Sequence, residues 1–263
     1  MNTDSYIMRE FGVGERALAL LTQAELALAA RFAAIDETAR LGQARVMAAF
    51  AKQRIGEAHL MPTTGYGYND IGRDAIDAVY ARAFGCEDAL VRHQIISGTH
   101  SISTALFAVL RPGDTLLAAT GKPYDTLEQV IGLVGEAGEG SLADFGVRYR
   151  QAELTAEGKI DFEALSAAIH GTTKAVLIQR SKGYGWRDTL SVAQIIECVA
   201  FVKGIRSDIV CLVDNCYGEC VEDTEPRADL LMVSLIKNPG GGLAQSGGYI
   251  AGKERYVSLA ANR

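Results

Sequence analysis

The sequence predicts an α/β fold: a mostly parallel sheet covered by helices on both faces, in three layers. Apolar segments of strand length alternate with segments of helical spacing along most of the chain, as consecutive parallel strands require. The segment Ser207–Asp214 (SDIVCLVD) is apolar and β-branched, which is typical of a strand buried on both faces. With 263 residues, of which 48% are hydrophobic, the chain is long enough for one substantial core.

The N-terminal part is predicted to form a pair of helices. From Glu15 to about Arg54 the chain is rich in alanine, leucine and charged residues. Its apolar residues recur with helical spacing, at Leu18, Leu21, Leu26, Leu28, Phe32 and Ile35. We expect this amphipathic face to pack against the main body or against a partner subunit. Residues 1–58 are therefore assigned to an N-terminal helical segment and residues 59–263 to the main domain.

A loop is predicted between His59 and Asp70, because glycine and proline interrupt the helical spacing in the segment MPTTGYGYND. Its tyrosines, Tyr66 and Tyr68, have two interpretations. Loops of this kind often carry functional residues. An ordinary turn whose tyrosines pack on a neighbouring helix explains the pattern equally well.

After this loop, predicted helices and strands take turns. The expected helices are 71–84, 99–110, a helix from 124 onward, 161–169 and 192–202. The expected strands are 88–93, 115–119, 145–151, 174–179, two segments near 209 and 230, and a further strand at 248–252. This alternation is the main evidence for the parallel sheet.

Composition excludes several classes of function. The formal net charge is −6 and the isoelectric point is about 5.3, so we expect no general attraction to nucleic acid or to an anionic membrane. We also expect no apolar segment long enough to span a bilayer. A small molecule is the expected partner.

The cysteines indicate a reducing compartment. The chain has five of them, an odd number without C-x-x-C spacing, and no apolar secretory leader is evident, so we expect a cytoplasmic protein. Cys211, Cys216 and Cys220 lie close together in sequence, but Cys211 falls within an apolar strand and no histidine is near. We therefore predict no metal site.

Lys237 is the strongest candidate for a catalytic residue. It lies in the segment Ser234–Gly242 (SLIKNPGGG), after an apolar run and before a glycine loop. Asp214 ends a predicted strand and should face the ligand crevice of an open α/β sheet. Together they indicate pyridoxal 5'-phosphate (PLP): the lysine would hold the aldehyde as a Schiff base, and the carboxylate would keep the pyridine nitrogen protonated. At about 4 Å and an effective dielectric of about 20, that ion pair contributes roughly 4 kcal/mol before desolvation.

A phosphate site is predicted where Gly98 and Thr99 lead into a helix. Backbone N–H groups there point outward at the positive end of the helix dipole. Taken alone, the Ser-Gly-Thr sequence is explained better by an ordinary helix cap. Ser234 adds a hydroxyl group that could reach the same phosphate.

Two further residues follow other predicted strands. Tyr124 could lie flat against a planar heterocycle, and Ser181 could donate a hydrogen bond to a ring substituent. A capping or core role for the tyrosine is an equal alternative. His93 and His100 are interpreted as structural residues rather than as acid or base groups.

These segments resemble the aluminium resistance protein family, which is similar to methionine γ-lyase and to cystathionine-metabolising enzymes of the fold-type I PLP class. The resemblance rests on Gly65–Asp74, Ser97–His100, Gln179–Tyr184, Val213–Asn215 and Ser234–Gly242. It implies that Lys237 is the Schiff-base lysine, Asp214 the partner of the pyridine nitrogen and Tyr124 the ring-stacking residue. It places Gly98, Thr99 and Ser234 at the phosphate. By rough position, Tyr68 and Arg73 are candidates to complete that site from the neighbouring subunit or to contact substrate.

The resemblance implies a PLP-dependent carbon–sulfur lyase that acts on a sulfur-containing amino acid of the methionine or cystathionine type, as a homodimer or homotetramer. Family members continue past the lysine into more of the large domain and a small C-terminal domain, so we expect this chain to lack those parts. Two alternatives stay open: another fold-type I reaction, such as transamination or cysteine desulfuration, and a truncated scaffold without activity.

Overall fold

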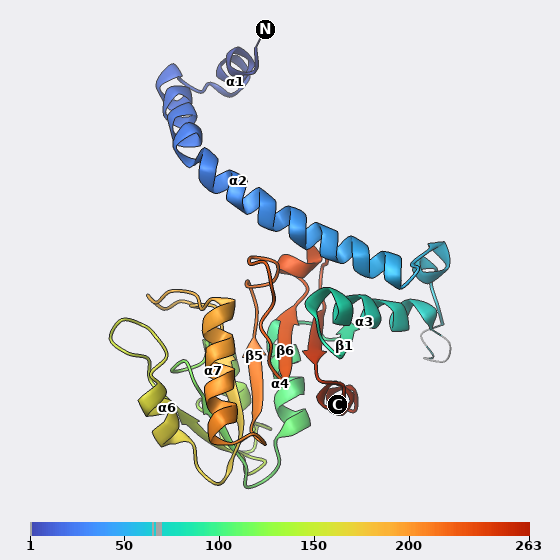
Figure 1. The fold of residues 1–263 in the computed structure, drawn as a ribbon, viewed down its shortest axis with the longest axis vertical. Coiled ribbons are helices and arrows are strands. Elements are labelled where there is room, and N and C mark those ends of the chain that lie inside the picture. Colours follow the sequence, from blue (N-terminus) through green and yellow to red (C-terminus); the bar gives the residue numbers. More distant parts are fainter. Residues whose placement is uncertain (1, 65, 67–69) are drawn as a thin grey trace. The chain divides into compact units, whose positions relative to one another are not determined.

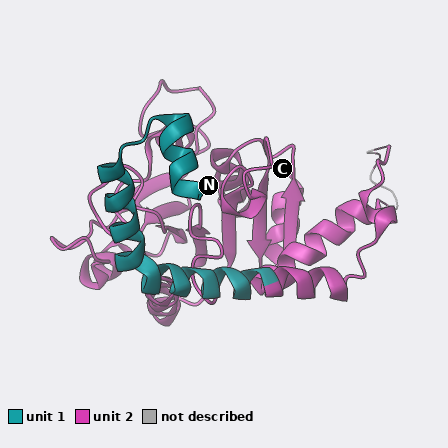
Figure 2. Cartoon of the chain, turned by 90° about the horizontal axis from the view of Figure 1, so that it is seen from above, with its two compact units in different colours: residues 1–43 teal, residues 44–263 magenta. Residues whose placement is uncertain are grey.

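The computed structural model describes residues 2–64, 66 and 70–263. By its internal contacts the chain divides into two compact units, residues 1–43 and residues 44–263, which Figure 2 colours separately. Tyr68, one of the candidate site residues, lies outside the described residues.

The first unit consists of helix α1 (Thr3–Phe11) and most of helix α2 (Glu15–Lys52). The Asn2 side chain caps α1, and Gly12 ends it in the left-handed conformation. The prediction of a helix pair between Glu15 and Arg54 is wrong, because α2 is one continuous helix of 38 residues. No proline interrupts this segment, and its alanine and leucine content favours helix throughout.

Helix α2 is long and apolar enough to cross a membrane, by length and composition alone. An 18-residue window in it has a mean hydropathy of 1.5, and none of that window is buried. Our expectation that no segment meets these criteria is therefore wrong for α2. Leucines predicted to be a packing face are exposed, among them Leu21, Leu26 and Leu28.

The second unit contains a sheet that, within the described residues, has seven strands in the order β1-β7-β6-β5-β4-β2-β3. Figure 1 labels β1, β5 and β6 of this sheet. The strands are β1 (Asp88–Arg92), β2 (Thr115–Ala118), β3 (Arg148–Gln151), β4 (Thr173–Gln179), β5 (Val210–Asp214), β6 (Leu230–Ser234) and β7 (Gly248–Gly252). β2, β3, β4, β5 and β6 pair in parallel, and β7 is antiparallel to both of its neighbours. The predicted α/β class with a mostly parallel sheet is confirmed.

Helices cover both faces of this sheet. They are α3 (Ile71–Phe84), α4 (Gly98–Val109), α5 (Asp125–Ile131), α6 (Phe162–Ala168), α7 (Val192–Ile205) and α8 (Glu254–Ala261), with 3-10 turns η1 (Glu57–Leu60) and η2 (Asn238–Gly240). Buried residues of α4, α5 and α8 pack on one face, and those of α6 and α7 pack on the other.

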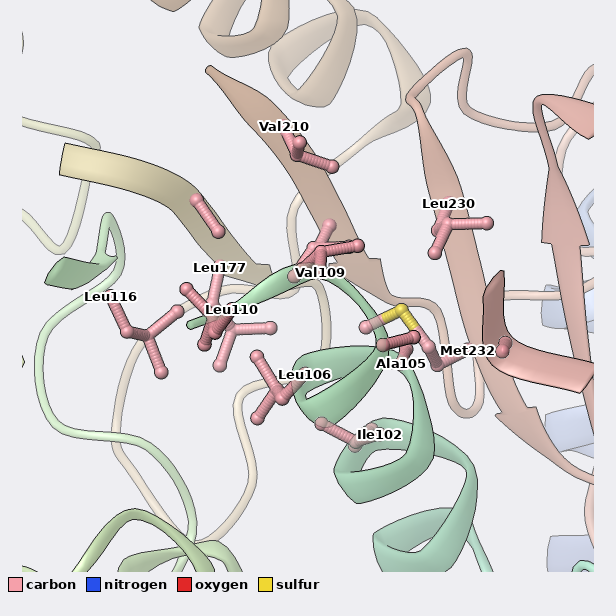
Figure 3. Packing of buried hydrophobic residues seen from close by; sticks show 14 of the residues in the cluster. Ile102, Ala105, Leu106, Val109, Leu110, Leu116, Leu177, Val210, Leu230 and Met232 are labelled. Atoms are coloured by element: carbon pink, nitrogen blue, oxygen red, sulfur yellow. The ribbon is translucent and has the colours of Figure 1, made fainter. Parts of the chain in front are cut away.

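Strand β4 shows how the two cores are separated. Alternate side chains of a strand point to opposite faces. Ala175 and Leu177 accordingly join the core under α4, with Leu106 and Met232 (Figure 3), while Val176 and Ile178 join the core under α7. A buried strand with consecutive apolar residues, here Ala175 to Ile178, therefore supplies two cores, which gives the three-layer arrangement.

Strand β3 is shorter than predicted. We expected it to begin at Phe145, but it begins at Arg148, because Gly146 takes the left-handed conformation with φ +76° and ends a turn there. Helix α8 was not predicted. Its apolar residues Val257 and Ala260 pack on the core of α4.

The core of β4 provides a test of this packing. Leu177 is 2% exposed, so Leu177→Ala should lower the free energy of unfolding by about 2–5 kcal/mol through lost burial and a residual cavity. Leu60, which is 78% exposed, is the matched control, and Leu60→Ala should change stability little. Urea denaturation of both variants measures the difference. Equal stability of the two would contradict the assignment of Leu177 to the core.

Candidate active site

The predicted site residues meet at the carboxyl edge of the parallel strands. Asp214 ends β5, Ser234 ends β6, and Gly98 begins α4. One cavity of about 540 Å³ lies at this edge. It is lined by all seven of the candidates for this chain's own site: Gly98, Thr99, Tyr124, Ser181, Asp214, Ser234 and Lys237.

Lys237 lies in the loop between β6 and η2, where it is partly buried. Its Nζ lies over the aromatic ring of Tyr217, 4.2 Å from the ring centroid. Burial alone disfavours the charged amine, but Cys216, Tyr217 and Asp214 outweigh it and raise the pKa of Lys237 above its usual value. The free amine is therefore an ammonium ion at neutral pH.

Asp214 is buried, at 4% exposure, and its Oδ1 accepts a hydrogen bond of 3.1 Å from the backbone N–H of Cys216. Burial raises the pKa of this carboxyl group, while hydrogen bonds from Cys216 and the charge of Lys237 act in the opposite direction. Lys237 supplies part of the positive charge that a buried carboxylate needs. A cation bound in the cavity would supply more of it.

The end of the cavity at α4 has features that suit a phosphate group. The first N–H groups of a helix have no acceptor within the helix, and here they belong to Gly98 and Thr99. The hydroxyl group of Ser234 is fully buried and has no hydrogen-bond partner among the described residues. A Cβ atom at Gly98 would lie 3.3 Å from both Cys216 Sγ and Ser234 Cβ, so glycine keeps this part of the cavity open.

Tyr124 is held by hydrogen bonds at both ends. Its hydroxyl group lies 2.9 Å from Thr99 Oγ1, which also contacts Thr126 Oγ1 at 2.9 Å. Its backbone N–H donates to Gln179 Oε1 at 3.0 Å. Burial raises the pKa of the Tyr124 phenol. The ring is therefore held at the cavity as a neutral phenol at neutral pH. Tyr124 also takes the N-cap position of α5 and packs against the core of α4, so its ring-stacking role stays a prediction.

Ser181 lies in the loop that follows β4, and a half-buried guanidinium fixes that loop. Arg187 donates to the carbonyl oxygens of Gln179 and Ser181, at 2.9 and 2.6 Å. Gln179 Nε2 donates to the same Ser181 carbonyl at 3.1 Å. The Ser181 side chain thus lines the cavity from a braced backbone.

The turn that follows Asp214 was missed by the sequence analysis. Arg180, which is 1% exposed, reaches behind the cavity and donates to Asn215 Oδ1 at 2.8 Å and to the Gly218 carbonyl at 2.7 Å. A Cβ atom at Gly218 would collide with this guanidinium. The sequence analysis did not identify Arg180 as a buried residue. Its position directly after an apolar strand was the available signal that it is buried.

Arg73, proposed to act at the neighbouring subunit's site or on substrate, lies on α3. Its side chain contacts Asp70 at 3.5 Å, and it is not among the residues that line this chain's cavity. Its predicted role in a neighbouring site stays a prediction, as does that of Tyr68. His93 and His100 do not line the cavity either.

The described residues of the cavity fit PLP. An amine, a buried carboxylate, an unpartnered buried hydroxyl group and a helix N-terminus opened by glycine supply the donors and the charge that its aldehyde, pyridine nitrogen and phosphate require. Tyr124 supplies a planar surface.

Glu219 lies in the turn that follows Asp214 and is 1% exposed. Neither of its carboxyl oxygens has a hydrogen-bond partner among the described residues. Burial, with the nearby carboxylates Glu225 and Asp214, raises its pKa to about 8. Between its ordinary pKa of 4.5 and about 8 the folded protein keeps this proton and the unfolded chain loses it. Stability attributable to Glu219 therefore falls as the pH rises through this window.

Glu219→Gln should remove that loss, because glutamine imitates the protonated acid. The variant should gain stability relative to the parent between pH 5 and pH 8, as measured by urea midpoints. Glu163→Gln, at an exposed position of α6, is the control and should follow the parent at both pH values. Parallel midpoints for Glu219→Gln and the parent would show that Glu219 is not a buried acid.

Comparisons with known proteins agree with this geometry. Residues 17–263 match the family model described as methionine gamma-lyase. The uncharacterized protein YnbB of Bacillus subtilis is 51% identical over 232 residues, which cover 87% of this chain and 55% of YnbB. A solved structure from Clostridium novyi, described as a carbon-sulfur lyase involved in aluminum resistance, is 42% identical with a TM-score of 0.93, over 99% of this chain and 63% of that one.

A more distant solved structure shares the fold alone. The pyridoxal-5'-phosphate dependent protein YhfS of Escherichia coli is 19% identical with a TM-score of 0.64, over 87% of this chain and 58% of that one. Together with the Clostridium novyi structure, this likeness confirms the predicted fold. The family match over residues 17–263 confirms the predicted family. The chain spans between 55% and 63% of the length of these three relatives. On its family match and its identity to these relatives, this chain belongs to the methionine gamma-lyase family.

Proposed function

We propose that this chain is the catalytic part of a PLP-dependent carbon–sulfur lyase acting on a sulfur-containing amino acid of the methionine or cystathionine type. One observation carries the proposal: in a member of the methionine gamma-lyase family, Lys237, Asp214 and the phosphate-suited end of α4 line a single cavity. The description of the Clostridium novyi relative as a carbon-sulfur lyase supports the same class of reaction.

The residues that line the cavity would have separate roles in binding PLP. Gly98 and Thr99, with the Ser234 hydroxyl group, bind the phosphate, and Ser181 donates a hydrogen bond to a ring substituent. Asp214 holds the positive charge of the pyridine nitrogen, for which its buried position is suited. When bound, PLP supplies an electron sink that stabilises negative charge at the substrate α-carbon.

Proton transfer falls to Lys237. The amine attaches the cofactor, and once displaced by the substrate amine it removes the proton from the α-carbon. It can accept a proton only when it is neutral, and in the cofactor-free protein the pKa of Lys237 is raised. A group near Lys237 must therefore influence the protonation state of this amine while it is not bonded to the cofactor. Elimination of a thiol then gives a keto acid with ammonia, whereas transamination gives a keto acid without ammonia, so product analysis identifies the reaction.

We further propose a cytoplasmic homodimer or homotetramer, in which Arg73 and Tyr68 of one subunit complete the phosphate site of another or contact its substrate. The position of Arg73 on α3, outside this chain's own cavity, supports a role at a neighbouring site. Size-exclusion chromatography with light scattering measures the oligomer.

Lys237→Ala should abolish the visible absorbance band of lysine-bound PLP, because no other amine in the cavity is proposed to bond the cofactor. The measurement is an absorbance spectrum after incubation with PLP. Lys174→Ala, at the opposite end of β4, is the control and should keep the band. A band of normal intensity in Lys237→Ala would contradict the assignment.

Asp214→Asn should retain bound PLP but lose turnover by about 100-fold or more, because a neutral amide no longer stabilises the protonated ring. Cofactor content and the rate of keto acid release, measured on the same preparation, separate the two effects. Turnover equal to that of the parent would exclude the proposed role of Asp214.

A further inference from the structure

We propose that the aromatic face of Tyr217 is a catalytic feature that holds Lys237 as an ammonium group, before this amine bonds to the cofactor and again after it has taken up the substrate proton. The inference deepens the proposed function and rests on it for the role of Lys237. Tyr217 lies three residues after Asp214, in the turn that the sequence analysis did not consider.

The contact between the two side chains is direct. Lys237 Nζ lies over the Tyr217 ring at 4.2 Å from its centroid, well inside the range of about 6 Å over which a ring face attracts a cation. Both residues line the same cavity. The charged or titratable groups that face this amine are Cys216, Tyr217 and Asp214. The Asp214 carboxylate is the group assigned to the pyridine nitrogen. Burial raises the pKa of the Cys216 thiol, so this group is neutral at neutral pH. The side chain of Tyr217 is then the remaining group that can attract the ammonium.

The backbone of Tyr217 is in a conformation that tyrosine rarely adopts. Its φ is +69°, in the left-handed region, and among the described residues the other non-glycine positions with positive φ are Arg54 and Cys220. Cys220 lies in the same turn. Strained backbone of this kind persists where surrounding contacts enforce it, and it concentrates at functional sites.

Specific hydrogen bonds enforce this conformation. Asn238, the residue after Lys237, donates from Nδ2 to the carbonyl oxygens of Tyr217 and Glu219, at 3.2 and 3.0 Å. The Gly218 N–H donates to the Asn215 carbonyl at 2.9 Å, which closes the turn. Arg180 holds the other side of the turn, as described above. The loop that carries the amine and the turn that carries the ring are thus joined by one side chain.

The contact with Tyr217 suits the Lys237 amine, because this amine must release the cofactor and later bond to it again. A freed lysine is flexible and strongly hydrated, and it would drift toward solvent unless a local group attracted it. The ring face attracts the charged form without forming a salt bridge, so the ammonium stays near the cavity and can still give up its proton. Tyr217 is 59% exposed, so its ring is not packed into the core.

The test measures the pKa of Lys237 in the cofactor-free protein, by competitive labelling with acetic anhydride across a pH series and mass spectrometry of the Lys237 peptide. Tyr217→Gly removes the ring and relieves the strained φ, so the variant should fold. Tyr217→Asn is a second ring deletion that tolerates the same backbone. Tyr217→Phe keeps the ring. Tyr256→Phe on α8 is the control, because α8 follows the end of antiparallel β7 and so begins at the opposite edge of the sheet.

Without the ring, the midpoint of the Lys237 profile should move to lower pH, which raises the neutral fraction about three- to tenfold at a fixed pH below the midpoint. Tyr217→Phe should lie between the parent and Tyr217→Gly, and Tyr256→Phe should match the parent. An unchanged midpoint in both ring deletions would overturn the inference. So would a Tyr217→Phe midpoint equal to that of Tyr217→Gly, because the hydroxyl group and not the ring would then hold the amine.

These outcomes are independent of the proposed function, because no cofactor is present during labelling. If the parent protein fails to bind PLP while its Lys237 midpoint depends on the Tyr217 ring, the proposed function is wrong and the contact is real. If the parent binds PLP and the midpoint ignores the ring, the function stands and this inference is wrong.

Discussion

The site depends on the parallel pairing of β4, β5 and β6, which brings three segments distant in sequence to one edge. The register sets Gln179 beside Asp214 and Asp214 beside Met232. Because the strands run the same way, every loop that follows them opens on the same side. Apolar side chains on both faces fix this register, since a shift by one residue would exchange the two cores. The packing of the two cores thus determines which side chains meet at the site.

Several energetically unfavourable features lie near this edge of the sheet. Burial leaves the oxygens of Glu219 and the hydroxyl group of Ser234 without partners among the described residues, and Tyr217 keeps a strained backbone. Arg180 and Asn238 hold the turn between these residues with hydrogen bonds to backbone carbonyls and to Asn215. A phosphate at Ser234 and a cationic ring at Asp214 would satisfy groups that the protein alone leaves unsatisfied.

Much of this was predictable from the sequence, because the buried strands are short, apolar and separated by clear helical spacing. Asp214 and Lys237 were found for a similar reason: Asp214 ends such a strand, and Lys237 lies three residues after the end of another. Helix α2 was misinterpreted as two helices, although its uniform helical pattern contains no signal for a break. The role of the Tyr217 turn could not be predicted, because a left-handed tyrosine has no composition signature, and its conformation depends on Arg180 and Asn238 from distant parts of the chain.

The most direct test of the whole account is to incubate the purified protein with PLP, reduce it with borohydride and locate the label by peptide mass spectrometry. The account predicts a pyridoxyl group on the peptide that contains Lys237, with loss of the visible band on reduction. Well-folded protein that remains colourless, or a label confined to surface lysines, would contradict it.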